Sequence, residues 1–266
     1  MKNKKNLVSV IIPTRYRLRL LKKAIKSALD QSITPNQIII VDDACENKIE
    51  RYIFNLKRNY KNIDIKYIKR ENYSEASSPA SINLGFKNTT SKYIALLDDD
   101  DVWDKNYLRE CLKTVKISKA KLIISPLYHV RNKKIKIGKK IPRYFNLQDW
   151  FRFNPGLICS NIFINSKIFK KLKMLDSKLV YSADRDFMIR FCLRKFKYSI
   201  LERPMVYYRL SNQVLKSKKF FIYFKSNLRF YRKYFFLMNF RSHLLNLIKL
   251  FRYLILIILN LIKKKI

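Results

Sequence analysis

Two kinds of apolar segment alternate along the amino-terminal part of the chain. Some are short, apolar throughout and rich in β-branched residues, whereas others place apolar side chains at helical spacing. In chain order the pattern predicts strand, helix, strand, helix, strand, helix and strand over residues 7–12, 18–28, 38–41, 49–60, 63–67, 77–85 and 93–97. This alternation favours an α/β fold with a mostly parallel, Rossmann-like sheet flanked by helices.

The pattern becomes mixed after about residue 125. The remaining predicted elements are a hairpin over 127–137, strands over 156–164, 198–201 and 205–209, and a helix over 184–195. Beyond Glu202 no acidic residue occurs, and residues 220–262 are aromatic, aliphatic and basic. We therefore expect a folded domain over residues 1–212 and a basic helical carboxy-terminal tail over residues 213–266.

Polar residues follow directly after the predicted strands. Thr14 follows the first strand, Asp42 and Asp43 follow the second, and residues 98–101 are four consecutive aspartates after the fourth. Ligands of open α/β sheets bind beyond the carboxyl ends of the strands. Because no GxGxxG or GxxxxGK[ST] loop is present, any phosphate must be held in another way.

The four aspartates repel one another, so their partial burial needs a cation or hydrogen-bond donors. Carboxylate oxygens suit Mg²⁺ or Mn²⁺, and such an ion bridges to substrate phosphates. A solvated acidic turn, or the start of a helix packed on Trp103 and Tyr107, is the alternative. The cluster alone leaves both interpretations open.

Charge and cysteine content narrow the class of protein. The 58 Lys and Arg residues against 19 Asp and Glu give a net charge of +39, which favours polyanionic partners such as phosphorylated substrates, anionic lipid or nucleic acid. The four cysteines have no metal-ligand spacing and are interpreted as reduced thiols. The apolar run near the amino terminus is too short for a signal peptide, so we expect a cytoplasmic protein.

Three segments together carry a resemblance to a known family. They are VSVIIPTRYRLRLLKKAIKSALDQS, IIIVDDA and SSPASINLGFKNTTSKYIALLDDDDVW. In order and spacing they resemble the family 2 glycosyltransferases with a GT-A fold, over about residues 7–210. The resemblance implies a nucleoside-diphosphate sugar donor, usually a UDP-sugar, bound by residues 1–103, and an acceptor bound by residues 104–212.

The same resemblance assigns roles to individual residues. It implies contacts to the nucleotide sugar from Pro13, Thr14, Arg15, Asp42, Asp98, Asp99 and Asp100, with Asp42 at the base. Asp100 and Asp101 are the expected ligands of Mg²⁺ or Mn²⁺. The segment YSADRDFMIRF resembles the start of the catalytic helix of the family, which makes Asp184 the expected general base.

The chemistry requires a group such as Asp184. An acceptor hydroxyl that attacks an anomeric carbon must lose its proton, and a positioned carboxylate can take it. Attack from the face opposite the leaving group inverts the anomeric centre. Without the resemblance, Asp184 is better interpreted as a helix cap than as a base, and Asp186 as a first-turn charge that favours the helix dipole.

The chain departs from the pattern of the family at several positions. Arg15 to Arg17 replace the usual start of the first loop, and Ala44 and Cys45 replace Gly-Ser. Relatives often carry an arginine at the position of Ile82, an acidic residue at that of Ala183 and a histidine at that of Ser211. The Ser211 position leaves the metal ligands in doubt. Because no QxxRW motif occurs, we expect single sugar additions rather than processive synthesis.

The carboxy-terminal tail is both cationic and apolar. Its last helix candidate, 244–262, has nearly the length of a membrane span, but Lys249 and Arg252 interrupt it. We expect an interfacial helix with basic side chains at anionic headgroups, so that the enzyme lies at the inner face of the cell membrane beside a glycan or lipid-linked acceptor. The alternative is a helical pair that packs on the catalytic domain.

Two other classes of protein fit part of the sequence. The apolar strand before Asp98-x-Asp100-x-Val102 resembles the nucleophile motif of haloacid-dehalogenase-type phosphohydrolases, although that motif normally lies near the start of a domain. The basic and aromatic composition also fits a nucleic-acid-binding protein. Acidic residues at the strand ends disfavour a nucleic-acid-binding protein, so we expect no nucleic-acid partner. The sequence does not give the oligomeric state. We expect instead a transferase of bacterial surface polysaccharide or lipopolysaccharide synthesis.

Overall fold

The computed structural model describes residues 7–71, 77–210 and 218–262. Within them, a central sheet consists of β1 (Val8–Thr14), β2 (Gln37–Asp42), β3 (Asp64–Lys69), β4 (Tyr93–Leu96), β6 (Leu122–Ile124), β9 (Ile162–Asn165) and β10 (Tyr198–Ile200). The strand order is β10-β6-β9-β4-β1-β2-β3. β9 is antiparallel to both of its neighbours, whereas the other pairs are parallel. The predicted mostly parallel sheet is confirmed.

A smaller sheet lies beside the carboxyl end of β4. It consists of β5 (Val102–Trp103), β11 (Val206–Arg209), β7 (Leu127–Arg131) and β8 (Lys134–Ile137), in that order. β7 and β8 are antiparallel and form the hairpin predicted for residues 127–137. β5 pairs with β11, and β5 follows the four aspartates directly, so this pairing fixes the position of the acidic loop.

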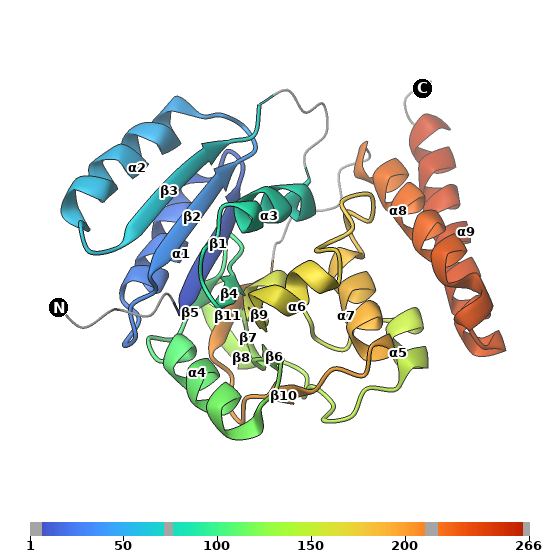
Figure 1. Cartoon of the computed structure of the whole chain (residues 1–266). Helices are drawn as coiled ribbons and strands as arrows, with labels where there is room; N and C mark the ends of the chain where they lie inside the picture. The colour runs from blue at the N-terminus through green and yellow to red at the C-terminus, as the bar shows by residue number, and fades with distance from the viewer. Residues whose placement is uncertain (1–6, 72–76, 211–217, 263–266) are drawn as a thin grey trace.

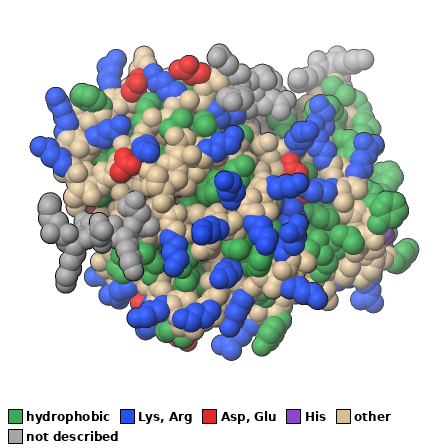
Figure 2. Space-filling model, in the orientation of Figure 1, with side chains coloured by type: hydrophobic (Ala, Val, Ile, Leu, Met, Phe, Trp, Pro, Cys, Tyr) green, Lys and Arg blue, Asp and Glu red, His purple; other side chains and the backbone are tan. Residues whose placement is uncertain are grey.

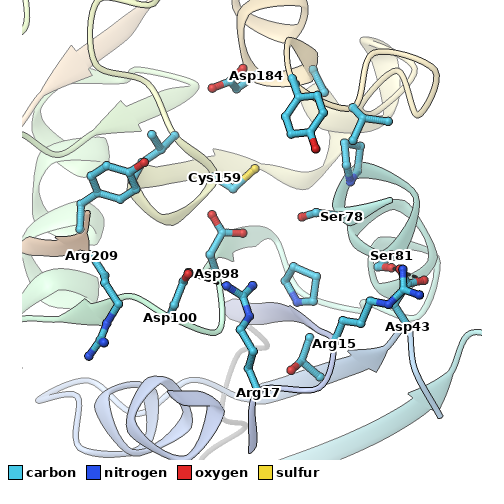
Figure 3. A pocket seen from close by; sticks show the side chains of 18 residues that line it. Arg15, Arg17, Asp43, Ser78, Ser81, Asp98, Asp100, Cys159, Asp184 and Arg209 are labelled. Atoms are coloured by element: carbon cyan, nitrogen blue, oxygen red, sulfur yellow. Dashed lines mark hydrogen bonds and ion pairs between the residues drawn. The ribbon is translucent and has the colours of Figure 1, made fainter. Parts of the chain in front are cut away.

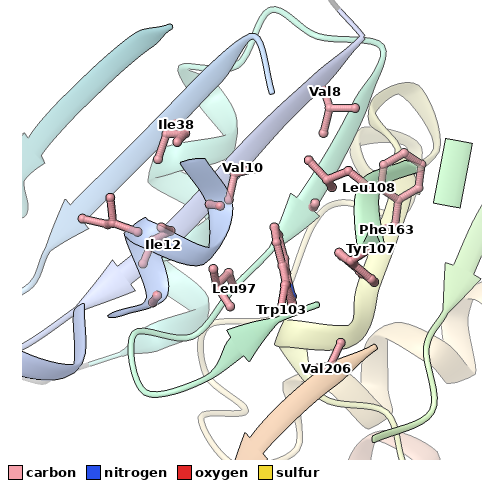
Figure 4. Packing of buried hydrophobic residues seen from close by; sticks show 14 of the residues in the cluster. Val8, Val10, Ile12, Ile38, Leu97, Trp103, Tyr107, Leu108, Phe163 and Val206 are labelled. Carbon is pink, nitrogen blue, oxygen red and sulfur yellow. The ribbon is translucent and has the colours of Figure 1, made fainter. Parts of the chain in front are cut away.

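Helices cover both faces of the central sheet (Figure 1). They are α1 (Leu18–Leu29), α2 (Asn47–Asn59) and α4 (Tyr107–Ser118), together with α3 (Ser78–Lys87), α5 (Leu147–Arg152), α6 (Ser166–Lys171) and α7 (Ala183–Leu193). Side chains of β1 alternate between two cores: Val8, Val10 and Ile12 pack with α1, α2 and α4 (Figure 4), whereas Ile11 packs with the core that includes α3, α6 and α7. This alternation is the period-two pattern of a strand buried on both faces.

Gly85 allows α3 to lie close to the sheet. A Cβ atom at this position would lie 2.6 Å from the Cγ2 atom of Ile11, so a larger residue would push the helix off β1. The helix begins as predicted, because the Ser77 hydroxyl accepts a hydrogen bond from Ala80 N and Pro79 lies in the first turn. Close contact between α3 and β1 places the start of α3 at the edge of the sheet where the aspartates lie.

The segment 156–164 differs from its predicted extended conformation. Only its end belongs to β9, and a short 3₁₀ helix, η1 (Cys159–Asn161), precedes that strand. Gly156 has φ +117°, a conformation that favours glycine, and the side chain of Asn161 donates to the carbonyl of Gly156. These contacts turn the chain, and this turn forms one side of the site described below.

The tail forms two helices, α8 (Lys218–Tyr234) and α9 (Phe240–Ile262), joined by the 3₁₀ helix η2 (Phe235–Leu237). The helices pack on each other and, through α7 and α5, on the rest of the molecule (Figure 1). Within the described part of the chain, α9 is the one helix long and apolar enough to cross a membrane, with a mean hydropathy of 2.0. On the face shown in Figure 2, hydrophobic side chains gather along this edge of the molecule, whereas Lys and Arg side chains are scattered over the rest.

Candidate active site

A cavity of about 510 Å³ lies beyond the carboxyl ends of β1, β2 and β4. The predicted site residues that line it are Pro13, Thr14, Arg15, Asp98, Asp100 and Asp184. Asp184 lies across the cavity from Asp98 and Asp100 (Figure 3). The structure therefore brings together side chains from three regions that are far apart in the sequence, as strand ends at one edge of a sheet allow.

The four consecutive aspartates alternate in direction. Asp98 and Asp100 line the cavity, whereas Asp99 and Asp101 are buried, with 0% and 1% of their surfaces exposed. Two carboxylates are thus available to a ligand and two are used inside the protein.

Asp99 connects the acidic loop to the loop after β1. It accepts a hydrogen bond of 2.6 Å from the Thr14 hydroxyl, and the guanidinium of Arg17 lies 2.5 Å from its other oxygen. Arg17 also lies 2.5 Å from a carboxylate oxygen of Asp100. Thr14 and Asp99 therefore shape the cavity by holding its two walls together, and Arg17 neutralises part of the acidic charge.

Asp101 holds the acidic loop from the opposite side. One of its oxygens accepts a hydrogen bond of 2.6 Å from the Ser160 hydroxyl, and the other accepts one of 2.8 Å from Arg209 N. The same Ser160 oxygen accepts a hydrogen bond from Asp98 N. Because both carboxylate oxygens of Asp101 have protein partners away from the cavity, the geometry gives no support to the predicted metal-ligand role of Asp101.

The residues that face the cavity fit a divalent ion. Burial, together with the neighbouring carboxylates, raises the pKa of Asp98 well above its usual range. No group of three His, Cys, Asp or Glu side chains forms a metal site within the described ranges. Mg²⁺, however, commonly uses one or two carboxylates and takes its other ligands from waters and substrate phosphates. Asp98 and Asp100 supply this type of donor set.

Asp42 does not reach the cavity. It is fully buried at the end of β2, where its carboxylate accepts hydrogen bonds from Ala44 N, Glu46 N and the Tyr67 hydroxyl. Its neighbour Asp43 lines the cavity instead and forms an ion pair with Arg70. Asp42 thus holds the loop after β2, and the predicted contact of its side chain with the base is not reproduced by this geometry.

Asp184 lies in the first turn of α7, where the helix dipole favours a negative charge. Its oxygens accept hydrogen bonds of 2.7 Å from the Asn154 side chain and 2.8 Å from Arg185 N. Burial raises the pKa of Asp184 to about 6, although these donors oppose the increase. A carboxylate with this pKa is ionised at neutral pH and basic enough to accept a proton from a hydroxyl during reaction.

The residue after Asp184 connects the site to the tail. The Arg185 guanidinium is buried, donates to the carbonyls of Trp150 and Phe151 at the end of α5, and lies 4.3 Å from the ring centre of Phe230 in α8. From α9, Asn246 donates 2.8 Å to the same Phe151 carbonyl, and the Lys249 ammonium contacts the next carbonyl of α5. Cations at a helix carboxyl end are favourable.

Asp186 is a structural residue. It is fully buried, forms ion pairs of 2.6 Å with Arg190 and Lys233, and accepts a hydrogen bond of 2.6 Å from the Tyr234 hydroxyl. Lys233 and Tyr234 belong to α8, so Asp186 joins the helix that carries Asp184 to the tail. The structure therefore shows the tail helices packed on the domain, as the alternative interpretation of the tail expected.

Sequence reasoning missed several residues of the site. Asn154, Ser160, Tyr181 and Arg209 contact or line it. Tyr181 begins the segment YSADRDFMIRF that marked Asp184, so that segment was its signal. The local sequence of the other three does not mark them, because each becomes relevant only when distant segments meet. Arg17 was visible as a departure from the family pattern, but its partners Asp99 and Asp100 lie more than eighty residues away along the chain, so its ion pairs depend on the fold.

The other departures have different outcomes. Ile82 is fully buried in the core against which α3 packs, and Ala183 is buried at the start of α7. Ile82 does not line the cavity, whereas Ala183 lines it with an apolar side chain in place of an acidic one. The position of Ser211 lies outside the described residues, so the expectation about the metal ligands that rests on it stays a prediction.

Comparison with known proteins identifies the class. The structure matches the crystal structure of Staphylococcus aureus TarS in complex with UDP-GlcNAc, with a TM-score of 0.64 and 14% identity, over 84% of this chain and 65% of that one. This likeness shows the fold, which is of the GT-A type, as predicted.

The sequence matches are more specific. Residues 9–173 match the family model described as glycosyl transferase family 2. An uncharacterized glycosyltransferase of Methanocaldococcus jannaschii is 30% identical over 237 residues, which cover 83% of this chain and 78% of that protein. A Campylobacter jejuni GalNAc(5)-diNAcBac-PP-undecaprenol beta-1,3-glucosyltransferase is 34% identical over 94 residues, 35% of this chain and 29% of that protein.

The chain belongs to glycosyl transferase family 2 and is an inverting enzyme with a GT-A fold. The predicted resemblance is confirmed. Family membership favours the transferase over both the phosphohydrolase and the nucleic-acid-binding alternatives.

Proposed function

We propose that this enzyme transfers one sugar at a time from a UDP-sugar to a glycan or lipid-linked acceptor, with inversion, in the synthesis of a bacterial surface polysaccharide or lipopolysaccharide. The observation that carries the proposal is the position of Asp184 across one cavity from Asp98 and Asp100. A likeness to a structure that contains UDP-GlcNAc supports the choice of donor.

The cavity contains groups suited to the two halves of the donor. Arg15, Arg17 and Arg209 line it together with Asp98 and Asp100. Asp98 and Asp100 would hold an Mg²⁺ or Mn²⁺ ion, and the arginines would bind the diphosphate. When bound, the ion neutralises the charge that develops on the departing nucleoside diphosphate.

Asp184 acts on the acceptor. As the acceptor oxygen forms its bond to the anomeric carbon, the bond from that carbon to the diphosphate oxygen breaks, and its electron pair leaves with the nucleoside diphosphate. The proton of the acceptor hydroxyl passes to the Asp184 carboxylate. Asn154 and Arg185 N hold this carboxylate on the side of the cavity opposite the acidic loop, so attack comes from the face opposite the leaving group and inverts the centre.

The tail supports a position at the inner face of the cell membrane. Exposed apolar side chains extend along α9, including Leu244, Ile248, Phe251 and Ile255, in a region with no acidic residue. An apolar face bordered by basic residues is the pattern of helices that lie in anionic membrane interfaces. The name of the Campylobacter relative includes a diphosphate-linked lipid, which is consistent with an acceptor at the same surface.

A donor screen tests the proposal. The purified protein is incubated with a panel of nucleotide sugars, Mn²⁺ or Mg²⁺, and crude lipid-linked glycan acceptors, and release of the nucleoside diphosphate is measured. We expect release from one or a few UDP-sugars that increases when acceptor is added. Release of phosphate from simple phosphomonoesters, with no turnover of any nucleotide sugar, would contradict the proposal.

A further inference from the structure

A second cavity lies where the loop before α7 meets α8. It has a volume of about 100 Å³ and its lining includes Lys178, Lys225 and Arg229. Val180 lines both this cavity and the candidate active site, so the two adjoin. With about a fifth of the volume of the candidate active site, the smaller cavity suits a phosphate group rather than a nucleotide.

The cations of this cavity lack acidic partners. Nearby Asp176 forms its ion pair with Lys233, at 2.8 Å, and Asp186 is likewise paired with Lys233. Within the described ranges, Lys178, Lys225 and Arg229 form no ion pair with a carboxylate. Positive groups gathered around one cavity without counter-charges favour an anionic ligand, and a guanidinium with lysine ammoniums suits phosphate oxygens.

The geometry of the cavity is held by backbone contacts. The Arg229 guanidinium donates a hydrogen bond of 3.1 Å to the Lys178 carbonyl, which links α8 to the loop. The Ser226 hydroxyl, which also lines the cavity, accepts a hydrogen bond from Tyr181 N. These contacts hold the loop against α8, so the exposed Lys178, Lys225 and Arg229 line the same cavity from two elements.

The same cavity opens onto apolar surface. Phe221 and Ile222 of α8 line it and are 53% and 38% exposed. The exposed side of α9 continues this apolar surface along the edge of the molecule (Figure 2). A free phosphate would bury none of this apolar surface, whereas a hydrocarbon chain attached to the phosphate would cover it.

Stacked tyrosines fix this region relative to the active site. Tyr181, which lines the active-site cavity, stacks on Tyr223 of α8 with ring centres 3.6 Å apart and an interplanar angle of 13°. Tyr223 in turn stacks on Tyr253 of α9 at 5.5 Å. The wall between the two cavities therefore contacts both tail helices, and the smaller cavity lies beside the active site.

We propose that Lys178, Lys225 and Arg229 bind the phosphate groups of a lipid-linked acceptor. The lipid chain lies along Phe221, Ile222 and the exposed side of α9, and the sugar of the acceptor passes Val180 to reach Asp184. The inference rests on the proposed function for the identity of the bound lipid as acceptor. Binding of a lipid phosphate at this position does not depend on it.

Farnesyl diphosphate, a soluble prenyl diphosphate, is the probe, and its binding to the full chain is measured by calorimetry. We expect it to bind at least about tenfold more tightly than inorganic diphosphate, because about two buried CH₂ groups suffice for such a difference. The double variant Lys225→Glu/Arg229→Glu should weaken binding at least about tenfold through loss of charged hydrogen bonds. Arg232→Glu, on the same helix but outside the cavity lining, is the matched control and should bind within about twofold of the unchanged chain.

UDP binding, measured on the same preparations, separates the possible failures. If UDP binding is retained in both variants, the fold is intact and weaker prenyl diphosphate binding reports the cavity. If the unchanged chain binds farnesyl diphosphate as described but binds no UDP, the proposed function fails while the lipid phosphate site stands.

Three results would overturn the inference. They are equal binding by the unchanged chain and the double variant, equal affinity for inorganic and farnesyl diphosphate, and full displacement of the probe by phosphatidylglycerol vesicles at matched phosphate concentration. The second result would assign the cavity to free phosphate, and the third to lipid headgroups in general.

Discussion

The two acidic walls of the active site use the same chemical group in different ways. On one wall, Asp98 to Asp101 are adjacent. Thr14 and Arg17 hold the buried Asp99, and Ser160 holds the buried Asp101. On the other wall Asp184 is a single carboxylate held by one amide side chain and one backbone N–H. The first wall has an excess of negative charge that a cation can satisfy, and the second has one carboxylate, Asp184, which we propose as the base.

The comparison shows how the environment decides the role of a carboxylate. Burial is the largest cause of a raised pKa at Asp98, Asp101 and Asp184 alike. The difference lies in the neighbours, because like charges surround Asp98, whereas Asp184 has hydrogen-bond donors and a helix amino end. Each of the following changes removes one of these features.

The largest effect is expected for Asp184→Asn. The variant keeps the shape of the side chain but cannot accept the proton, so sugar transfer should fall by about 10²- to 10⁴-fold. UDP binding, followed by calorimetry, should change little, because Asp184 lies across the cavity from the acidic loop. If transfer and UDP binding were lost together, Asp184 would have a structural role instead.

Loss of the divalent ion is expected to have the next largest effect. Treatment with EDTA should remove transfer activity, and Mn²⁺ or Mg²⁺ should restore it. In the variant Asp100→Asn, the metal concentration for half-maximal activity should rise by at least about 10- to 100-fold. Loss of a residue that merely hydrogen-bonds a metal ligand already weakens metal binding by that factor. Activity that survives chelation in the unchanged chain would show that arginines alone hold the diphosphate.

The pH dependence of transfer reports the base. Since the pKa of Asp184 is raised to about 6, the active carboxylate form is lost as pH falls through that value, and the rate should then fall about tenfold per pH unit. Asn154→Ala removes a donor that stabilises the ionised form, so the pKa and the acidic limb should move upward by about one unit. An unchanged limb in Asn154→Ala would mean that another group controls the profile.

The smallest effect on chemistry is expected for Ser160→Ala. This change removes the hydroxyl that bonds both Asp101 and the backbone of Asp98, so the free energy of unfolding should fall by about 1–3 kcal/mol. Thermal unfolding measures the change. The metal concentration for half-maximal activity should remain that of the unchanged chain. A large increase in this concentration would support a metal-ligand role for Asp101.

Much of the fold was predictable because its signals are local. The strand at 93–97 and the helix at 77–85 follow from periodicity, a serine cap and a proline in the first turn, and the structure has β4 and α3 there. The turn at Gly156 was not predictable, because it depends on Asn161 and on contacts that form only in the folded chain. Short apolar runs do not distinguish a strand from a buried turn.

The candidate site also has features that the sequence predicts and features that only the folded chain shows. The sequence places Asp98, Asp100 and Asp184 in the site, and the structure brings all three to one cavity. Which of four adjacent aspartates face the ligand depends on partners such as Ser160, more than fifty residues away along the chain. The carboxylate of Asp42 is likewise occupied by the loop that follows it, a detail set by hydrogen bonds rather than by residue type.

The carboxyl end of α5 is shared by the catalytic helix and the last helix. Arg185, next to the base, and Asn246 of α9 donate to one carbonyl of α5. A force on α9, such as its partition into lipid, therefore reaches the neighbour of Asp184 through a single peptide group. We therefore expect detergent or bilayer to alter turnover, and a shortened chain that ends before α9 to lose this contact with α5 and to differ from the full chain in turnover.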